Sequence, residues 1–321
     1  MIVNTRMINK TILAILISLC ATAVMMSSCN TGIESTRAIK MSKSDKRAAL
    51  PTEEELFAEK FASAPLGEWK SGKAFLVADD KASLLYKPDG DVGSSELKGD
   101  TLLFESVALR PTPGDEQAAV IRFRSKKEGI LYNYATGKSL NNVSTEITGL
   151  DLPALIDLDV VREVGDALRG KQLWILSSLW YDAEGNVIHG LKFVPVTVTA
   201  VSSGNLFFPV TVEFTDGRTH SKVFMNVHNS SGIGGESRTF PSLFSLSDPK
   251  LNYQSVSPEV WRLIQQGRVA TGMTKEECRL SLGNPPDVDS GHDWNNTIDI
   301  WRYKDGTFLH FQDGLLVNYR H

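Results

Sequence analysis

Two runs of short apolar segments, separated by turn residues, constrain the fold of this chain more than any other feature. The first run comprises residues 74–77, 84–86, 102–109, 118–123 and 130–134, and the second comprises residues 173–176, 179–181, 193–201, 210–214 and 223–227. Segments of this length, bounded by Gly, Pro and Asp, are typical of β-strands. The sequence therefore predicts a multidomain protein that is mainly β, with some α+β structure.

The two runs also resemble each other. Residues 72–77 (GKAFLV) match residues 170–175 (GKQLWI), residues 85–90 match residues 180–185, and residues 120–123 match residues 211–214. A repeat on this scale predicts two tandem small β-barrels of SH3-like size, each preceded by a helix, at residues 51–149 and 150–245. Chance similarity among short strands is the alternative.

Helical signals flank these runs. Thr52 and Glu55 fit a capping box that opens a helix before the first run. Residues 151–168 switch to helical spacing, with an apolar face that ends before Gly170. Each predicted barrel thus has one helix in front of it.

The N-terminus has the pattern of an export signal. Arg6 and Lys10 precede an apolar stretch that is short for crossing a bilayer, and the stretch ends in Met-Ser-Ser before Cys29. This ending resembles a bacterial lipobox, which implies a signal peptide at residues 1–28 and acyl chains on Cys29. An ordinary secretory signal or an uncleaved anchor helix are the alternatives.

The residues after the cysteine bear on where the chain is retained. Asn30, in place of an aspartate, favours the outer membrane, and the lipid would hold the protein there, on the periplasmic face. Residues 29–50 are rich in Ser, Thr and Lys and predict a flexible tether, whose basic residues could instead touch anionic lipid.

The last part of the chain, residues 256–321, has the clearest local signals. Ser257 and Pro258 begin one helix, Thr274 and Glu277 form the capping box of a second, and Gly283 ends it. Three predicted strands follow at residues 298–303, 307–311 and 315–319, with Asp-Gly pairs at the two hairpin turns.

This helix-helix-three-strand order resembles the SmpA/OmlA (BamE-like) lipoprotein family. The matching segments are residues 272–277 (GMTKEE), 282–285 (LGNP), 300–303 (IWRY), 308–311 (FLHF) and 313–317 (DGLLV). The resemblance implies an α+β fold and a role in assembling outer-membrane proteins. It covers about a fifth of the chain, and β-lactamase-inhibitor proteins have a similar design, so fold and function need separate arguments.

Composition and motifs give little support to catalysis. A net charge of −4 without a concentrated basic stripe gives no reason to expect nucleic acid as a partner. The six histidines lack the spacing of metal ligands, so we expect no metal and no cofactor. Cys278 with His292 or His310 could form a nucleophile and base, but its place on an apolar helix face predicts a buried, inert thiol.

Aromatic residues are the better candidates for binding. Trp294 lies in a polar loop outside any apolar pattern, which is typical of contact anchors. Trp180 and Tyr181 could line a glycan cleft. We therefore expect a non-enzymatic, lipid-anchored envelope protein that acts through contacts with an envelope or outer-membrane protein. The alternatives are a peptidoglycan or glycan binding module, or a hydrolase inhibitor.

Overall fold

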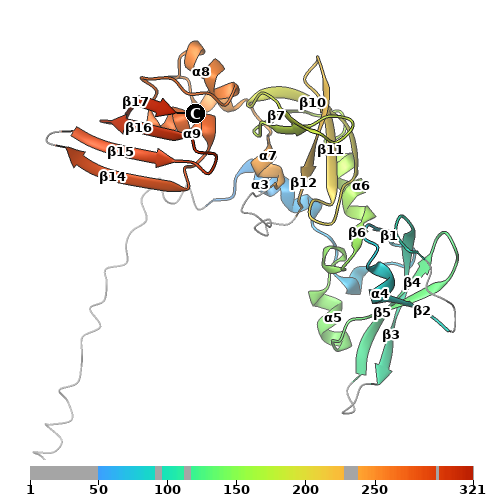
Figure 1. Ribbon diagram of the computed structural model, residues 1–321. Helices are drawn as coiled ribbons and strands as arrows, with labels where there is room; N and C mark the ends of the chain where they lie inside the picture. Colours follow the sequence, from blue (N-terminus) through green and yellow to red (C-terminus); the bar gives the residue numbers. More distant parts are fainter. Residues whose placement is uncertain (1–49, 91–95, 112–116, 228–237, 294–295, 321) are drawn as a thin grey trace, which may run out of the picture. The chain divides into compact units, whose positions relative to one another are not determined.

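The computed structural model describes residues 50–90, 96–111, 117–227, 238–293 and 296–320 (Figure 1). Three antiparallel sheets contain most of the regular structure, so the prediction of a mainly β, multidomain protein is confirmed. In these ranges no helix combines the length and the apolar character needed to span a bilayer. Cys29 lies outside the described residues.

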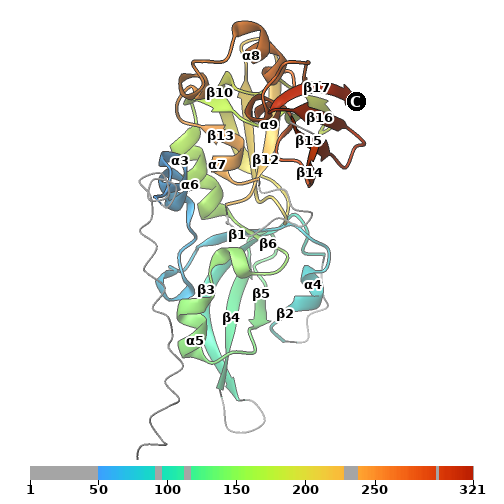
Figure 2. The ribbon, with the colours of Figure 1, turned by 90° about the vertical axis from the view of Figure 1, so that its left-hand side faces the viewer.

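The first sheet has six strands in the order β2-β5-β4-β3-β1-β6. Its strands are β1 (Ala74–Val77), β2 (Tyr86–Pro88), β3 (Thr101–Pro111), β4 (Gln117–Ser125), β5 (Leu131–Ala135) and β6 (Leu155–Asp157). Its helical segments are η2 (Leu66–Glu68), α4 (Ala82–Leu85), α5 (Leu140–Glu146) and η3 (Gly149–Asp151). The strands β3 and β4 form a long hairpin (Figure 2).

The second sheet has seven strands in the order β13-β7-β10-β11-β12-β8-β9. These are β7 (Gln172–Ile175), β8 (Leu179–Tyr181), β9 (Val187–His189), β10 (Val194–Ser203), β11 (Val210–Thr215), β12 (His220–Met225) and β13 (Phe244–Ser245). Helix α6 (Leu158–Leu168) packs on this sheet, and α7 (Phe240–Leu243) precedes β13 (Figure 2).

The two sheets have the same strand order. Read from one edge, the first sheet is β6-β1-β3-β4-β5-β2, and the second is β13-β7-β10-β11-β12-β8 with β9 added at the end. In both sheets the third strand in this order is the longest one, and a short helical segment precedes the last strand along the chain. The weak sequence similarity between the two runs therefore corresponds to a structural repeat.

Hydrogen bonds at the start of each sheet repeat as well. The Gly72 amide donates to the Phe104 carbonyl at 2.7 Å, and the Gly170 amide donates to the Val198 carbonyl at 2.9 Å. A β-bulge follows immediately after Phe104 and after Val198, and each of these residues pairs with a phenylalanine of the next strand. Both glycines have a positive φ, which a side chain would strain.

The packing of aromatic rings shifts our sequence alignment by one residue. Tyr86 meets Phe123 edge-on at 5.7 Å, and Trp180 meets Phe214 edge-on at 5.2 Å. Trp180 is therefore the counterpart of Tyr86, and not of the residue before it, as the match of residues 85–90 with 180–185 implied. Both rings lie in the core of their domains. Their packing therefore identifies corresponding residues of the two domains more exactly than sequence similarity does.

The predicted helix at residues 151–168 is wrong in its first half. Residues Leu155–Asp157 form the edge strand β6 of the first sheet, and the helix α6 begins only at Leu158. Asp157 caps that helix by accepting a hydrogen bond from the Asp159 amide. The apolar residues 155 and 156 fit either pattern, because a short buried strand and a helix face look alike over two residues.

The N-terminal helix α3 (Glu53–Ala58) begins with the predicted Thr52–Glu55 capping box. We expected it to belong to the first barrel, but it packs in the core of the second β domain. Phe57 and Phe61, the latter in the 3-10 turn η1 (Glu59–Phe61), contact the Phe240 ring. The segment that forms the first β domain, residues 66–157, is therefore inserted between two parts of the second.

The C-terminal domain contains two helices and a four-stranded sheet, one strand more than predicted. The helices are α8 (Pro258–Gln265) and α9 (Lys275–Leu282), after the turn η4 (Pro249–Asn252), and the strands are β14 (Asp287–Asp293), β15 (Asn296–Arg302), β16 (Phe308–Gln312) and β17 (Leu315–Arg320). The caps and both hairpin turns lie where the sequence placed them. Cys278 and Trp301 are buried in its core.

Candidate functional site

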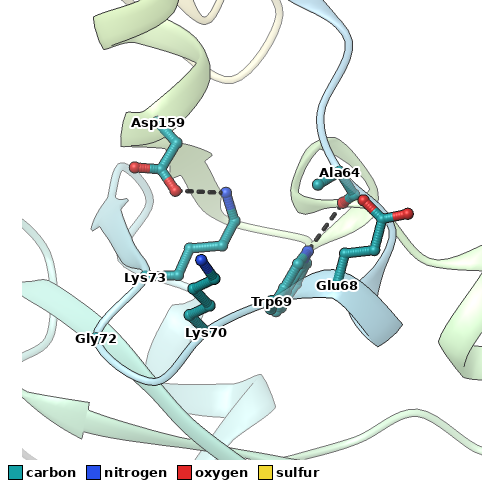
Figure 3. A pocket seen from close by; sticks show the side chains of 7 residues that line it. All are labelled: Ala64, Glu68, Trp69, Lys70, Gly72, Lys73 and Asp159. Carbon is teal, nitrogen blue, oxygen red and sulfur yellow. Dashed lines mark hydrogen bonds and ion pairs between the residues drawn. The ribbon is translucent and has the colours of Figure 1, made fainter.

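A pocket of about 300 Å³ opens beside the loop that precedes β1 (Figure 3). Its lining comprises Ala64, Glu68, Trp69, Lys70, Gly72, Lys73 and Asp159. Most of these residues come from the turn between η2 and β1, and Asp159 comes from the first turn of α6. The pocket therefore lies where the inserted first domain meets the helix of the second.

The Lys73 side chain is the centre of this pocket. Its ammonium group lies 2.8 Å from Asp157 Oδ1 and 3.0 Å from Asp159 Oδ2, and all but a small part of the lysine side chain is buried. The rings of Trp69 and Phe75 lie within 6 Å of the same nitrogen, at 5.7 and 5.3 Å. Two carboxylates and two ring faces thus stabilise one buried cation.

The carboxylates of Asp157 and Asp159 also interact with groups other than Lys73. Asp157, which is 1 % exposed, accepts a 2.6 Å hydrogen bond from the Ser63 hydroxyl, and that hydroxyl in turn accepts from the Gly149 amide. Partial burial raises the pKa of Asp159, but hydrogen bonds and charge from Lys73 and Arg162 outweigh it and lower the pKa overall. Asp159 is therefore ionised at neutral pH.

This arrangement does not suit catalysis. The ammonium of Lys73 is bound to two carboxylates, and the Trp69 indole donates to the Ala64 carbonyl at 2.8 Å, so these groups already have partners. A nucleophile or proton carrier needs a free lone pair or a transferable proton. The ion pairs of Lys73 therefore serve to hold the first domain against helix α6 of the second. The sequence did not predict this site, because a Gly-Lys pair at the start of a strand does not indicate that the lysine is buried.

The three aromatic residues predicted to bind a partner lie in different environments or outside the described residues. Trp180 is 3 % exposed, its ring packs on Phe214, and its indole donates to the Ser177 carbonyl, so it is a core residue rather than a glycan platform. Tyr181 is half-buried and stacks edge-on against Phe224. Trp294 lies outside the described residues.

A second buried lysine links the second domain to the C-terminal domain. The Lys192 ammonium donates to the carbonyls of Leu280, at 2.7 Å, and Ser281, at the end of α9. The next residue, Phe193, packs on the Trp261 ring at 5.5 Å. Carbonyls at a helix C-terminus favour a cation, so Lys192 acts as a side-chain cap supplied by another domain.

The stability contributed by Lys192 depends on pH. Burial lowers its pKa to about 8, from 10.5 for a free side chain. Between these values the unfolded chain binds more protons than the native protein, so this group's contribution to stability rises with pH. We expect the stability of the wild type relative to Lys192→Met to increase from about pH 7 to about pH 10, measured by urea unfolding. A difference that stays constant or falls would contradict the assignment.

Cys278 behaves as the sequence predicted for a buried thiol. Its side chain is fully buried in the C-terminal core, and burial together with the neighbouring Glu277 raises its pKa to about 12. A thiol of this kind is a poor nucleophile at neutral pH. Cys278 therefore does not form a nucleophile with His292 or His310.

Comparisons with known proteins identify no relative. No protein-family model, no characterised protein and no solved structure matches this chain. Within the described ranges, no group of three or more His, Cys, Asp or Glu side chains is arranged to hold a metal ion.

Proposed function

We propose that this protein is a non-enzymatic, lipid-anchored envelope protein that acts through protein–protein contacts made by its C-terminal sheet. Acylation of Cys29 would hold it on the periplasmic face of the outer membrane. The lipobox-like sequence supports the anchor. Confinement to one membrane would raise the local concentration of a membrane partner, so that a modest contact surface suffices.

The observation that carries the proposal is the edge strand β17. Leu315, Val317 and Tyr319 on this strand are each at least 40 % exposed, and the sheet order of the described chain ends at β17. Residues 272–274 pair only with its beginning: residues 272–273 bond to the backbone of Leu316, and Thr274 forms a bridge with Leu315. An open edge with apolar side chains is suited to pairing with a strand of another protein.

The opposite edge strand of the same sheet differs in character. Strand β14 carries Asp287 and Asp289 in its first three residues, and Arg302 pairs with both. Charged residues on an edge strand are a common protection against unwanted pairing. The contrast favours β17 as the contact edge.

We also propose that the C-terminal domain is BamE-like and that the two β domains are SH3-like. The order of two helices followed by an antiparallel sheet supports a BamE-like C-terminal domain, although it has a fourth strand. The size of each β domain supports the SH3-like interpretation. Assembly or maintenance of the outer membrane is the role that these resemblances favour, and peptidoglycan binding loses its predicted Trp180 platform.

A photo-crosslinking experiment in cells tests the contact edge. We expect a benzophenone amino acid at Val317, which is 42 % exposed, to give a discrete adduct with one membrane protein. Val187 is the matched control, because it is a 56 % exposed valine on the edge strand β9 of another sheet. The same Val317 variant combined with Cys29→Ala should lose the adduct.

The outcomes separate the parts of the proposal. Equal adducts from positions 317 and 187 would mean that β17 has no special role. An adduct that survives Cys29→Ala would show a partner that does not depend on the anchor. The absence of any protein adduct at Val317 would overturn the contact function.

A further inference from the structure

The hairpin that joins β10 to β11 ends in an exposed apolar tip. The tip is the turn at residues 204–209, in which Phe207 is 62 % exposed and Leu206 is 39 % exposed. No charged residue occurs between Val201 and Val212. Two large apolar side chains are thus presented to solvent from a stretch of chain without charge.

The turn that carries these side chains is tightly held. The Asn205 carboxamide oxygen accepts hydrogen bonds of 2.9 Å from the amides of both Phe207 and Phe208. The Gly204 amide donates to the Pro209 carbonyl, and a Cβ on Gly204 would lie only 2.2 Å from the Phe208 carbonyl oxygen. A turn fixed in this way presents Leu206 and Phe207 without a further ordering cost on binding.

The first β domain provides an internal comparison. Its hairpin β3–β4 occupies the same place in the repeat, but the sequence between the two strands, residues 112–116 (TPGDE), contains two acids and no large apolar residue. The repeated fold therefore does not require an apolar tip. The pair Leu206 and Phe207 has no counterpart in that sequence, which indicates a function rather than a need of packing.

We propose that Leu206 and Phe207 insert into the headgroup region of a phospholipid bilayer and provide a second membrane contact. The inference rests on the proposed lipid anchor, because two side chains bind a membrane weakly unless the chain is already held there. The surface area that two side chains can bury is far below the roughly 800 Å² per partner of a stable protein interface. It fits a lipid surface, and it has no charge to desolvate on entry.

The test uses the full-length protein reconstituted in vesicles of phosphatidylethanolamine and phosphatidylglycerol. A Phe207→Cys variant is labelled with an environment-sensitive fluorophore, and Cys278 stays unlabelled because it is buried. The matched control is Leu109→Cys, a 46 % exposed leucine near the end of the equivalent hairpin. We expect the label at position 207 to shift to shorter wavelength and to be quenched by brominated lipid, and the label at position 109 to remain unchanged.

Flotation of the same vesicles distinguishes the two proposals. Protein that floats and is quenched at position 207 supports both the anchor and the tip. Protein that floats without quenching at position 207 keeps the anchor and overturns the insertion; a protein partner for the tip is then the remaining explanation. Protein that does not float overturns both, and Cys29→Ala protein that still floats and is quenched would show that the tip binds lipid alone.

Discussion

Replacing Asp157 with asparagine is expected to lower the free energy of unfolding by about 3–5 kcal/mol. The substitution leaves the buried Lys73 ammonium without the carboxylate that lies 2.8 Å from it. It also replaces an acceptor of the Ser63 hydroxyl and of the Asp159 amide with a neutral amide. Urea unfolding, followed by tryptophan fluorescence, measures the loss.

Two further variants show whether this loss comes from the buried pair. Asp159→Asn removes the more exposed carboxylate beside the same lysine, so it should cost clearly less than Asp157→Asn. Lys73→Met combined with Asp157→Asn should recover part of the loss, because no unpaired cation is then buried. The effects of Lys73→Met alone and Asp157→Asn alone are the reference for this double variant. If these two effects simply add in the double variant, Lys73 and Asp157 are not coupled as the geometry requires.

Replacing Phe61 with alanine is expected to destabilise the second β domain by about 3–5 kcal/mol. Phe61 is fully buried among residues of that domain, and it lies edge-on to Phe57 and to Phe240. Hydrogen exchange measured by mass spectrometry should report faster exchange in β10–β12. The nearby Leu56→Ala is the control, because the Leu56 side chain is 49 % exposed and its truncation should have a much smaller effect.

The same experiment tests the domain assignment. If Phe61→Ala accelerates exchange in β3–β5 and leaves β10–β12 unchanged, the N-terminal segment belongs to the first domain, as the sequence suggested. If exchange instead becomes faster in the strands of the second sheet, the N-terminal segment belongs to the second domain, which is then discontinuous.

Local signals allowed much of the fold to be predicted. The capping boxes that begin at Thr52 and Thr274 and the helix end at Gly283 depend on neighbouring residues, so a single sequence is sufficient to place them. Strand β14 was missed because Asp287–Asp293 is polar and shows no alternation. It becomes a strand by pairing with β15, which is a tertiary effect.

The candidate site was harder to predict, for a related reason. Lys73 and Asp157 are far apart in sequence and meet because β6 pairs with β1 at the edge of the first sheet, where Phe75 lies opposite Asp157. The burial of Lys192 depends on the C-terminal carbonyls of a helix in another domain. Trp180 was considered a contact residue because its core partner Phe214 cannot be identified from spacing alone.

The discontinuous second domain determines how mechanical load would pass through the chain. Helix α3 and strand β13 are both built into that domain, which leads directly into the C-terminal domain. A pull between the N-terminal end of the chain and a partner held at β17 would therefore run through the second and third domains. The inserted first domain lies outside that path, so it would carry no load and would stay folded while the other two domains bear tension.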